Sequence, residues 1–442
     1  MMSSHTYQFI RLCLRRLPGV QKIALALHEE FSSALSAKDK EEIAEITPLN
    51  ARASAIETPR LNLLLPGVSK RHLFGGASTA LRLLQALGQG IELRVLVTDE
   101  WRFEGLDSEQ FSLWDIREAT EEDANGNCLV PLGRRHGVTV PVRRADIFIA
   151  SAWWTAHLTQ ALTEWQSRAY ALAKRPFVYL IQDFEPGFYP WSAKYVLAEQ
   201  TYHSDNTLIA VFNSSQLRQF LHDRGYRFGE EYVFEPVLNP VLSNYLALQK
   251  PVKKQRQILV YGRPSVPRNA FPLIVQALRL WAASDPAASQ WLVLSAGETH
   301  PPISLPNGVT LTPLGKLELH AYAHTLAASA IGLALMISPH PSYPPLDMAA
   351  FGLRTLTNDF GTKRLGRDHP NIIGLNNLSP DFIARQLTAL TAAFEEHEAD
   401  SESHPWSSQA AGFMPPEPPF PFIKALRERC LALLDDTASS PD

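Results

Sequence analysis

Positively charged side chains stand just beyond two apolar, β-branched runs in the second half of the chain. Arg263 ends the run QILVYGR, Lys316 directly follows GVTLTPLG, and Arg268 opens the helical pattern after Arg263. Guanidinium and ammonium groups in such positions bind phosphate oxygens through charge-assisted hydrogen bonds. The alternative is a purely solvated surface position, which is usual for Arg and Lys. Cations beyond two strand ends that face one crevice favour an anionic ligand.

The segment SPHPSYPPLDMAAFG, residues 338 to 352, offers two more candidate ligand contacts. Its prolines fix the backbone, and Tyr343 can stack on a ligand or hydrogen-bond to it. Asp347, near the start of the next helical pattern, can accept hydrogen bonds from a ribose hydroxyl. Capping the N-terminus of that helix is the alternative role for Asp347.

The first half of the chain carries a glycine pair and two carboxylates at comparable positions. Gly75 and Gly76 follow an apolar run and begin a helical pattern. Such glycines let backbone N–H groups approach an anion or a sugar, although a tight strand-to-helix turn also requires glycine. Asp183 ends the run FVYLIQD and, together with Glu185, could face an acceptor. A turn-stabilising role is the alternative for Asp183.

Strands that alternate with helical patterns are predicted to position these residues. The runs apolar on both faces are 61–66, 92–99, 145–151, 177–183 and 207–214, and then 257–263, 291–298, 308–315, 330–338, 354–359 and 371–376. Runs of this kind, separated by helix-length segments, indicate parallel sheets covered on both sides. Two such sheets in succession form a cleft between the carboxyl ends of their strands. We therefore expect an α/β fold with its site in that cleft.

The pattern divides the chain into four parts. We expect an N-terminal helical extension without a strand over 1–57, a first domain over 58–250 and a second over 251–416. The remainder, 417–442, contains a helical pattern from Phe422 to Leu434 that should pack back on the body. A length of 442 residues, at about 100 to 200 residues per domain, is consistent with two cores.

Composition narrows the functional classes. Hydrophobic residues make up 45% of the chain and charged residues 19%, which is typical of a folded protein. With 41 basic and 45 acidic side chains the net charge is −4, which argues against a nucleic-acid-coating protein. Cys13, Cys128 and Cys430 form no CxxC pair, so neither a zinc module nor a disulfide framework is expected, and the cytoplasm is the predicted location.

A membrane span is not predicted, but peripheral membrane contact is an option. The longest uncharged apolar stretch, Leu326 to Ile337, is about half the length that crosses a bilayer. Near the N-terminus an amphipathic helical pattern has apolar and basic faces, formed by Ile10, Cys13, Leu14 and Leu17 and by Arg11, Arg15 and Arg16. A helix of this kind lies on an anionic inner-membrane surface or, more commonly, docks on its own protein.

Other catalytic motifs are absent from the sequence. There is no DxD motif for a divalent metal at a diphosphate, no GxSxG elbow and no GxxxxGK[ST] loop. Metal-ligand spacing is also missing among His136, His157, His203 and His340. We therefore expect no metal, and hydrolase and ATPase activities are not supported.

Taken together, these segments resemble the GT-B glycosyltransferases of family 4, and most closely the WsaF-type bacterial rhamnosyltransferases. The resemblance rests on LNLLLPGVSKRHLFGGASTAL, YLIQDFEPGFYPW, VYGRP, GKLEL and SYPPLDMAAFG and covers nearly the whole chain. It implies two facing Rossmann-like domains, with the nucleotide-sugar donor held by the second. The donor-contacting positions of the family match Arg263, Lys316, Tyr343 and Asp347. Family 4 enzymes generally carry a Glu, seven residues and a second Glu; here Pro339 and Asp347 occupy those two positions.

The same resemblance implies transfer of L-rhamnose from dTDP-β-L-rhamnose to a cell-surface glycan, with retention and without a metal or other cofactor. Arg263 and Lys316 would stabilise the leaving diphosphate, with Arg268 nearby, and Asp183 would lie on the acceptor side. The alternatives are another nucleotide sugar, a GT-B sugar-nucleotide epimerase, and a non-catalytic nucleotide-sugar-binding module. The expected partners are the donor and a glycan acceptor; the oligomeric state stays open, with a dimer as one option.

Overall fold

The computed structural model describes residues 42–69, 75–107, 110–203, 208–248, 252–399 and 420–435. The amphipathic pattern around Ile10 to Leu17 lies outside the described residues. So do the expected domain boundaries at 250/251 and 416/417. Within the described residues no helix is long and apolar enough to cross a membrane.

The five apolar runs of the first half, joined by β4, β5 and β10, which were not predicted, form an all-parallel sheet in the order β10-β9-β8-β7-β2-β3-β5-β4. Its strands are β2 (Arg60–Leu65), β3 (Glu92–Val97), β4 (Asp115–Ile116), β5 (Cys128–Pro131), β7 (Asp146–Ala150), β8 (Phe177–Ile181), β9 (Leu208–Phe212) and β10 (Glu230–Val233). The helices of this domain are α3 (Gly76–Leu87), α4 (Trp153–Tyr170), α5 (Ala193–Gln200) and α6 (Ser215–Asp223). A 3₁₀ turn, η2 (Glu185–Phe188), follows β8.

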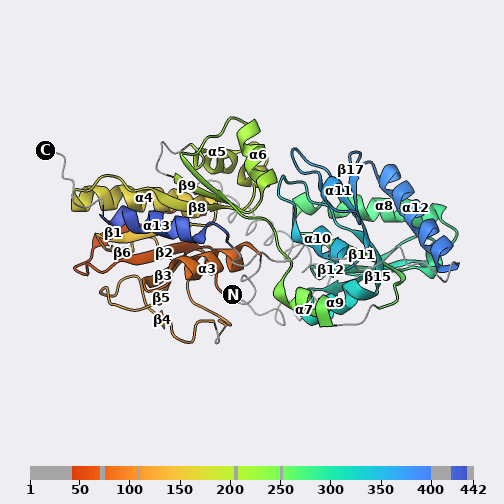
Figure 1. Ribbon diagram of the computed structural model, residues 1–442, viewed down its shortest axis with the longest axis horizontal. Coiled ribbons are helices and arrows are strands. Elements are labelled where there is room, and N and C mark those ends of the chain that lie inside the picture. Colours follow the sequence, from red (N-terminus) through yellow and green to blue (C-terminus); the bar gives the residue numbers. More distant parts are fainter. Residues whose placement is uncertain are drawn as a thin grey trace, which may run out of the picture.

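The second half forms a separate sheet in the order β13-β14-β12-β11-β15-β16-β17, in which only β13 is antiparallel. Its strands are β11 (Gln255–Gly262), β12 (Leu292–Gly297), β13 (Ile303–Ser304), β14 (Thr310–Gly315), β15 (Ser329–Leu333), β16 (Arg354–Asn358) and β17 (Ile372–Leu375). The helices around it are α7 (Pro240–Leu248), α8 (Phe271–Ser284), α9 (Leu319–Ala328), α10 (Tyr343–Ala350), α11 (Leu365–Asp368) and α12 (Pro380–Ala399). Figure 1 shows the two domains side by side.

Helices cover both faces of the first sheet, as strands apolar on both sides require. Along β2, Leu61 and Leu63 are buried against α3, whereas Leu64 is buried in the cluster that includes α4 and α6. In the second sheet β11 behaves in the same way: Val260 packs with α8 and Leu259 with α9 and α10. Side chains alternate between the two faces because successive residues of a strand point in opposite directions.

In each sheet the strand that comes first along the chain lies in the middle, and a crevice forms beside it. The first strand of the domain, β2, lies between β3 and β7, and β11 lies between β12 and β15. In β11, Val260 aligns with Ser295 of β12 and with Leu333 of β15. Where the chain changes direction in this way, the loops at the carboxyl ends of the two strands separate and leave room for a ligand.

The expectation that residues 1–57 contain no strand is wrong. β1 (Asn50–Ala53) pairs in parallel with β6 (Thr139–Val142) in a small separate sheet. The guanidinium of Arg52 donates to the carbonyl of Ala119 at 2.9 Å and so fixes β1 to the body of the first domain. This strand depends on a partner far away along the chain, which explains why the local pattern did not indicate it.

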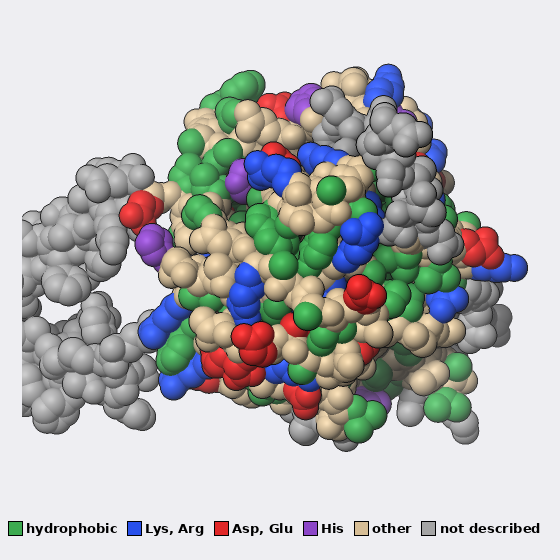
Figure 2. All heavy atoms as spheres, turned by 90° about the vertical axis from the view of Figure 1, so that its left-hand side faces the viewer, with side chains coloured by type: hydrophobic (Ala, Val, Ile, Leu, Met, Phe, Trp, Pro, Cys, Tyr) green, Lys and Arg blue, Asp and Glu red, His purple; other side chains and the backbone are tan. Residues whose placement is uncertain are grey.

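The last helix, α13 (Ile423–Asp435), lies on the first domain although it follows the second in sequence. Leu426 and Leu433 are buried in the same apolar cluster as α3, and Arg429 pairs with Glu230 of β10 at 2.8 Å. Figure 1 shows this blue helix among the early, red and yellow elements. Figure 2 views the end of the first domain that lies away from the second, where acidic, basic and apolar side chains are interspersed.

Candidate functional site

The two cations predicted at strand ends lie at one edge of the second sheet. Arg263 follows β11 and Lys316 follows β14, with only β12 between these strands. At about 4.8 Å per strand, their backbones are about 10 Å apart. Partial burial lowers the pKa of the Lys316 ammonium; the Glu318 carboxylate opposes this shift and the charge of Arg263 adds to it. The two positive charges therefore lie close enough at this edge for Arg263 to affect the pKa of Lys316.

The loop between Arg263 and Arg268 is held by the neighbouring strand end. Glu298, directly after β12, accepts hydrogen bonds from the backbone N–H and the hydroxyl of Ser265, at 3.0 and 2.8 Å. These bonds lower the pKa of the Glu298 carboxyl. They also fix the loop that follows Arg263.

Arg268 reaches across to the first domain rather than lying beside Arg263. Its Nε is 3.8 Å from an Oδ of Asp183, and its guanidinium carbon is 3.9 Å from the ring centre of Phe188. Both partners belong to the segment that follows β8. An ion pair combined with a cation–π contact thus joins the facing sides of the cleft.

Asp183 has both a local and a cross-domain role. Its Oδ1 accepts a hydrogen bond from the backbone N–H of Phe184 at 2.8 Å, which is the turn-stabilising contact named as the alternative. The same oxygen accepts a short hydrogen bond from the hydroxyl of Ser338 in the second domain. Asp183 is 8% exposed and lies at the contact between the domains.

Glu185 faces the interior of the first domain. Its carboxylate accepts hydrogen bonds from the backbone N–H of Trp153 and from the Tyr179 hydroxyl, the latter at 3.1 Å. Burial raises the pKa of this carboxyl to about 8. The structure therefore directs Glu185 toward α4 and β8, not toward an acceptor.

The glycine pair permits a close contact at the start of α3. Gly75 has φ +47°, a conformation that favours glycine, and precedes the helix. A Cβ atom on Gly76 would lie 2.8 Å from the side-chain oxygen of Gln182, which follows β8. This close approach places the N-terminus of α3 beside the segment of the first domain that contains Asp183.

Tyr343 and Asp347 occupy different environments on α10. Tyr343 is the first residue of the helix and contacts α3 of the first domain. Burial raises the pKa of the Tyr343 hydroxyl. The positive charge of Arg82 and a hydrogen bond with Thr79, both on α3, act in the opposite direction. Asp347 lies inside the helix, so the capping alternative is wrong; the residue before the helix is Ser342, at φ +70°. Burial raises the pKa of the Asp347 carboxyl to about 8.

Two buried titratable residues near α10 were not predicted as ligand contacts from the sequence. His340 is 8% exposed, and its Nδ1 accepts a hydrogen bond from the backbone N–H of Ser342 at 3.0 Å. Burial lowers its pKa to about 4, so its ring is neutral near pH 7. Lys363 is fully buried, donates to the carbonyl of Met336 at 2.6 Å, and has its pKa lowered to about 7 by burial.

Lys363 helps to hold the loop that carries the site. Met336 is bound by Asn358 as well as by Lys363. The Asn358 side-chain oxygen accepts a hydrogen bond from the N–H of Met336 at 2.7 Å, and the Asn358 side-chain nitrogen donates to the Met336 carbonyl at 2.9 Å. The next residue, Ile337, donates its N–H to the carbonyl of Arg268 at 2.7 Å. The start of the loop that contains His340 and Tyr343 is thereby fixed. No sequence pattern around Lys363 signals this role.

A metal centre is not formed within the ranges described above, since no group of three or more His, Cys, Asp or Glu side chains is placed to hold an ion. The site consists instead of cations at strand ends of the second domain, the α10 segment, and the Asp183 segment of the first domain. Arg263, Lys316, Tyr343 and Asp347 all belong to the second domain, whereas Gly76 and Asp183 belong to the first.

Known proteins with similar sequence and structure extend this description. The N-terminal domain of WsaF matches residues 60–215, and the C-terminal domain of WsaF matches residues 256–388. The O-antigen biosynthesis protein RfbC of Myxococcus xanthus is 33% identical over 207 residues. That match covers 46% of this chain and 16% of RfbC, so the chain spans only a small part of the length of this relative.

Solved structures share the two-domain arrangement at low sequence identity. A UDP-forming α,α-trehalose-phosphate synthase from Burkholderia vietnamiensis has a TM-score of 0.50 at 10% identity, covering 88% of this chain and 99% of its own. HepE from Anabaena, solved with UDP and glucose, has a TM-score of 0.49 at 11% identity, covering 86% and 98%. The sequence expectation of two facing parallel α/β domains is confirmed: the chain belongs to the WsaF family and has the GT-B fold.

Proposed function

We propose that this protein is a glycosyltransferase of cell-surface polysaccharide assembly, which moves a sugar from a nucleotide donor to a glycan acceptor. Membership of the WsaF family, the GT-B fold and the similarity to an O-antigen biosynthesis protein support this activity. The observation that carries the proposal is the placement of Arg263 and Lys316 at one edge of the second sheet. The Asp183 segment of the first domain contacts Ser338 and Arg268 of the second.

The proposed donor is dTDP-β-L-rhamnose. Arg263 and Lys316 would bind its diphosphate, Tyr343 would contact the nucleotide sugar, and Asp347 would bind the sugar of the nucleoside. Because deoxyribose lacks the 2′-hydroxyl, Asp347 can reach only the 3′-hydroxyl of this donor. At neutral pH the buried Asp347 carboxyl holds a proton and can donate as well as accept a hydrogen bond.

In the proposed reaction the protein acts chiefly on the leaving group. As the bond between sugar and phosphate breaks, negative charge accumulates on the diphosphate, and Arg263 and Lys316 would stabilise that charge. No metal ion or other cofactor is required in this scheme. Arg268, paired with Asp183, would hold the two domains together around the donor.

We further propose that the sugar is transferred with retention at the anomeric carbon. A phosphate oxygen of the donor would then take the proton of the acceptor hydroxyl, so a protein base is not obligatory. Glu185 is consistent with this scheme, because its carboxylate is occupied by Trp153 and Tyr179 inside the first domain.

One incubation tests the proposal. The protein is mixed with radiolabelled dTDP-L-rhamnose and a rhamnosyl acceptor, and the products are separated. Labelled glycan supports glycosyl transfer, and NMR of the new linkage shows whether the configuration is retained. An isomerised nucleotide sugar would indicate an epimerase, and bound donor without product would indicate a non-catalytic module. Parallel incubations with other nucleotide sugars determine donor specificity.

A further inference from the structure

A groove of about 720 Å³ opens at the carboxyl ends of β16 and β17. We call it the arginine groove; its lining includes Asp359, Phe360, Arg364, Gly366, Arg367 and Asn376. None of these residues belongs to the donor site proposed above. The volume lies within the range of pockets that hold small molecules.

The groove carries an excess of positive charge. Arg364 is oriented by two contacts, with its Nε 3.5 Å from an Oδ of Asp359 and its Nη1 donating to the carbonyl of Lys363 at 2.8 Å. Arg367 is exposed, and among the described residues no carboxylate lies within ion-pair distance of its guanidinium. The groove thus contains two guanidinium groups and one carboxylate. Arg364 pairs with Asp359, and the planar guanidinium of Arg367 is available to bind an oxyanion.

Glycines allow the segments that line the groove to pack closely. A Cβ atom on Gly366 would lie 2.8 Å from the backbone nitrogen of Gly374, and one on Gly374 would lie 2.8 Å from Oδ1 of Asp359. The close packing of these segments places Asp359, and with it Arg364, against the end of β17. The cation is therefore positioned before any ligand arrives.

Sheet geometry separates the groove from the cations of the donor site. The strand order β14-β12-β11-β15-β16-β17 puts three strand spacings between the ends of β11 and β17, and five between β14 and β17. At about 4.8 Å per spacing, the end of β17 is about 14 Å from that of β11 and about 24 Å from that of β14. A diphosphate held by Arg263 and Lys316 would not also occupy the groove.

The first domain borders this side of the second domain. The backbone carbonyl of Gln216 on α6 accepts a hydrogen bond from the Thr362 hydroxyl at 2.6 Å, and the Gln216 side-chain amide donates to the Asp368 carboxylate at 3.0 Å. The ring centre of Phe220, also on α6, is 6.1 Å from that of Phe360. Figure 1 shows α6 at the edge of the first domain that faces α11. The groove thus adjoins the domain that, in the proposed function, carries the acceptor.

We propose that the arginine groove binds an oxyanion carried by the acceptor, a phosphate or a carboxylate remote from the hydroxyl that receives the sugar. The inference rests on the proposed function, because it assigns the ligand to the acceptor. Arg367 and Arg364 bind the oxyanion, and Asp359 and the Lys363 carbonyl keep Arg364 in place.

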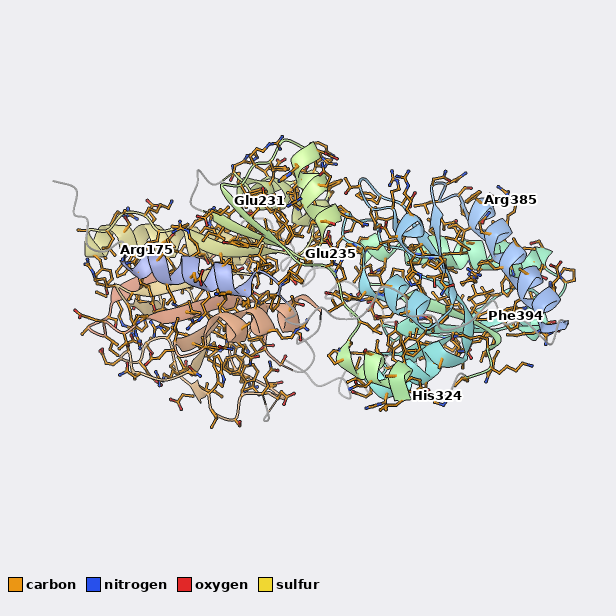
Figure 3. All side chains as sticks on the ribbon, in the orientation of Figure 1. Arg175, Glu231, Glu235, His324, Arg385 and Phe394 are labelled. Carbon is orange, nitrogen blue, oxygen red and sulfur yellow. The ribbon has the colours of Figure 1, made fainter. Side chains whose placement is uncertain are left out.

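The test uses the full chain with dTDP at saturating concentration, so that the donor site is filled. Methyl phosphate and glucuronate are the two probes, and their dissociation constants are measured by saturation-transfer NMR. Binding of at least one probe should be about tenfold weaker or more in Arg367→Gln, because a charge-assisted contact is lost. The control is Arg385→Gln on α12, which Figure 3 shows far from the domain contact and which should leave binding unchanged.

The outcomes separate the two proposals. Binding of methyl phosphate or of glucuronate, lost in Arg367→Gln and kept in Arg385→Gln, supports the groove and identifies the anion. Failure of both probes to bind while dTDP binds overturns the groove alone. Equal probe affinity in wild type and Arg367→Gln also overturns it. Failure of dTDP to bind contradicts the proposed dTDP-sugar donor, and the comparison of wild type with Arg367→Gln then still decides the groove.

Discussion

The buried Asp347 carboxyl should make the stability of the folded protein fall as the pH rises, and Asp347→Asn should remove this effect. Burial raises the pKa of Asp347 from its ordinary value of 3.8 to about 8. Between these values the unfolded chain has an ionised carboxylate, whereas the folded chain holds a proton. Because the unfolded state binds fewer protons, the free energy of unfolding decreases with pH across this window.

The expected change in the free energy of unfolding follows from the pH range between the two pKa values. One proton taken up on folding is worth about 1.4 kcal/mol per pH unit, so two units, from pH 5.5 to 7.5, correspond to about 3 kcal/mol. Asn has nearly the same shape and does not titrate. The stability of Asp347→Asn relative to wild type should therefore increase by about 2 to 3 kcal/mol between these pH values. Glu185, whose carboxyl pKa is raised to about 8, is present in both proteins, so its effect cancels in the difference.

Urea unfolding followed by circular dichroism at both pH values, at constant ionic strength, measures the difference. Asp381→Asn is the control, since that carboxylate is exposed on α12 and stays in water in both states. A stability difference between Asp347→Asn and wild type that is the same at pH 5.5 and 7.5 would refute the reasoning. It would mean that the Asp347 carboxyl is ionised in the folded protein.

Calorimetric titration of dTDP should show about ten- to a hundredfold weaker binding in Arg263→Ala and in Lys316→Ala, the loss of one charge-assisted contact. Unchanged affinity in both would remove the donor site from the second domain. Asp183→Asn should retain measurable transfer in the radiolabel assay; complete loss with a folded protein would call for a protein base. Gly76→Ala should leave the melting temperature nearly unchanged, because its Cβ meets only the flexible end of the Gln182 side chain, which can move aside. A clearly lower melting temperature would show that the Gln182 amide is held in place.

Most strands of both sheets could be predicted because burial on two faces leaves a local signature, whereas β4, β5, β10 and β13 were not among the predicted runs. β8 and β15 are buried at every position, and their sequences, FVYLI and SAIGL, reflect this. β1 has the sequence NARA and is only partly buried, so its existence depends on β6 and not on its own pattern. The predicted run 330–338 was too long, since β15 ends at Leu333 and Asn358 then holds Met336 in the loop.

The places of Arg263 and Lys316 in the fold could be predicted from the strand pattern. Arg263 and Lys316 follow parallel strands, and strand ends of one sheet meet at one edge. Lys363 could not be found, because its burial depends on a carbonyl that a distant loop supplies. The start of α10 was placed too late: Pro344 and Pro345 fit the first turn of a helix, so Asp347 lies inside it.

The packing of α13 on the first domain affects how the protein folds during its synthesis. The residues Phe420, Leu426 and Leu433 complete the apolar cluster that α3 and β2 begin. On the ribosome the second domain, residues 252–399, emerges before α13 does, so it can fold while the first domain still exposes part of its core. Nascent chains should therefore engage chaperones through the first domain until synthesis passes Leu433. A premature stop before Phe420 should yield an aggregating product whose second domain is still folded.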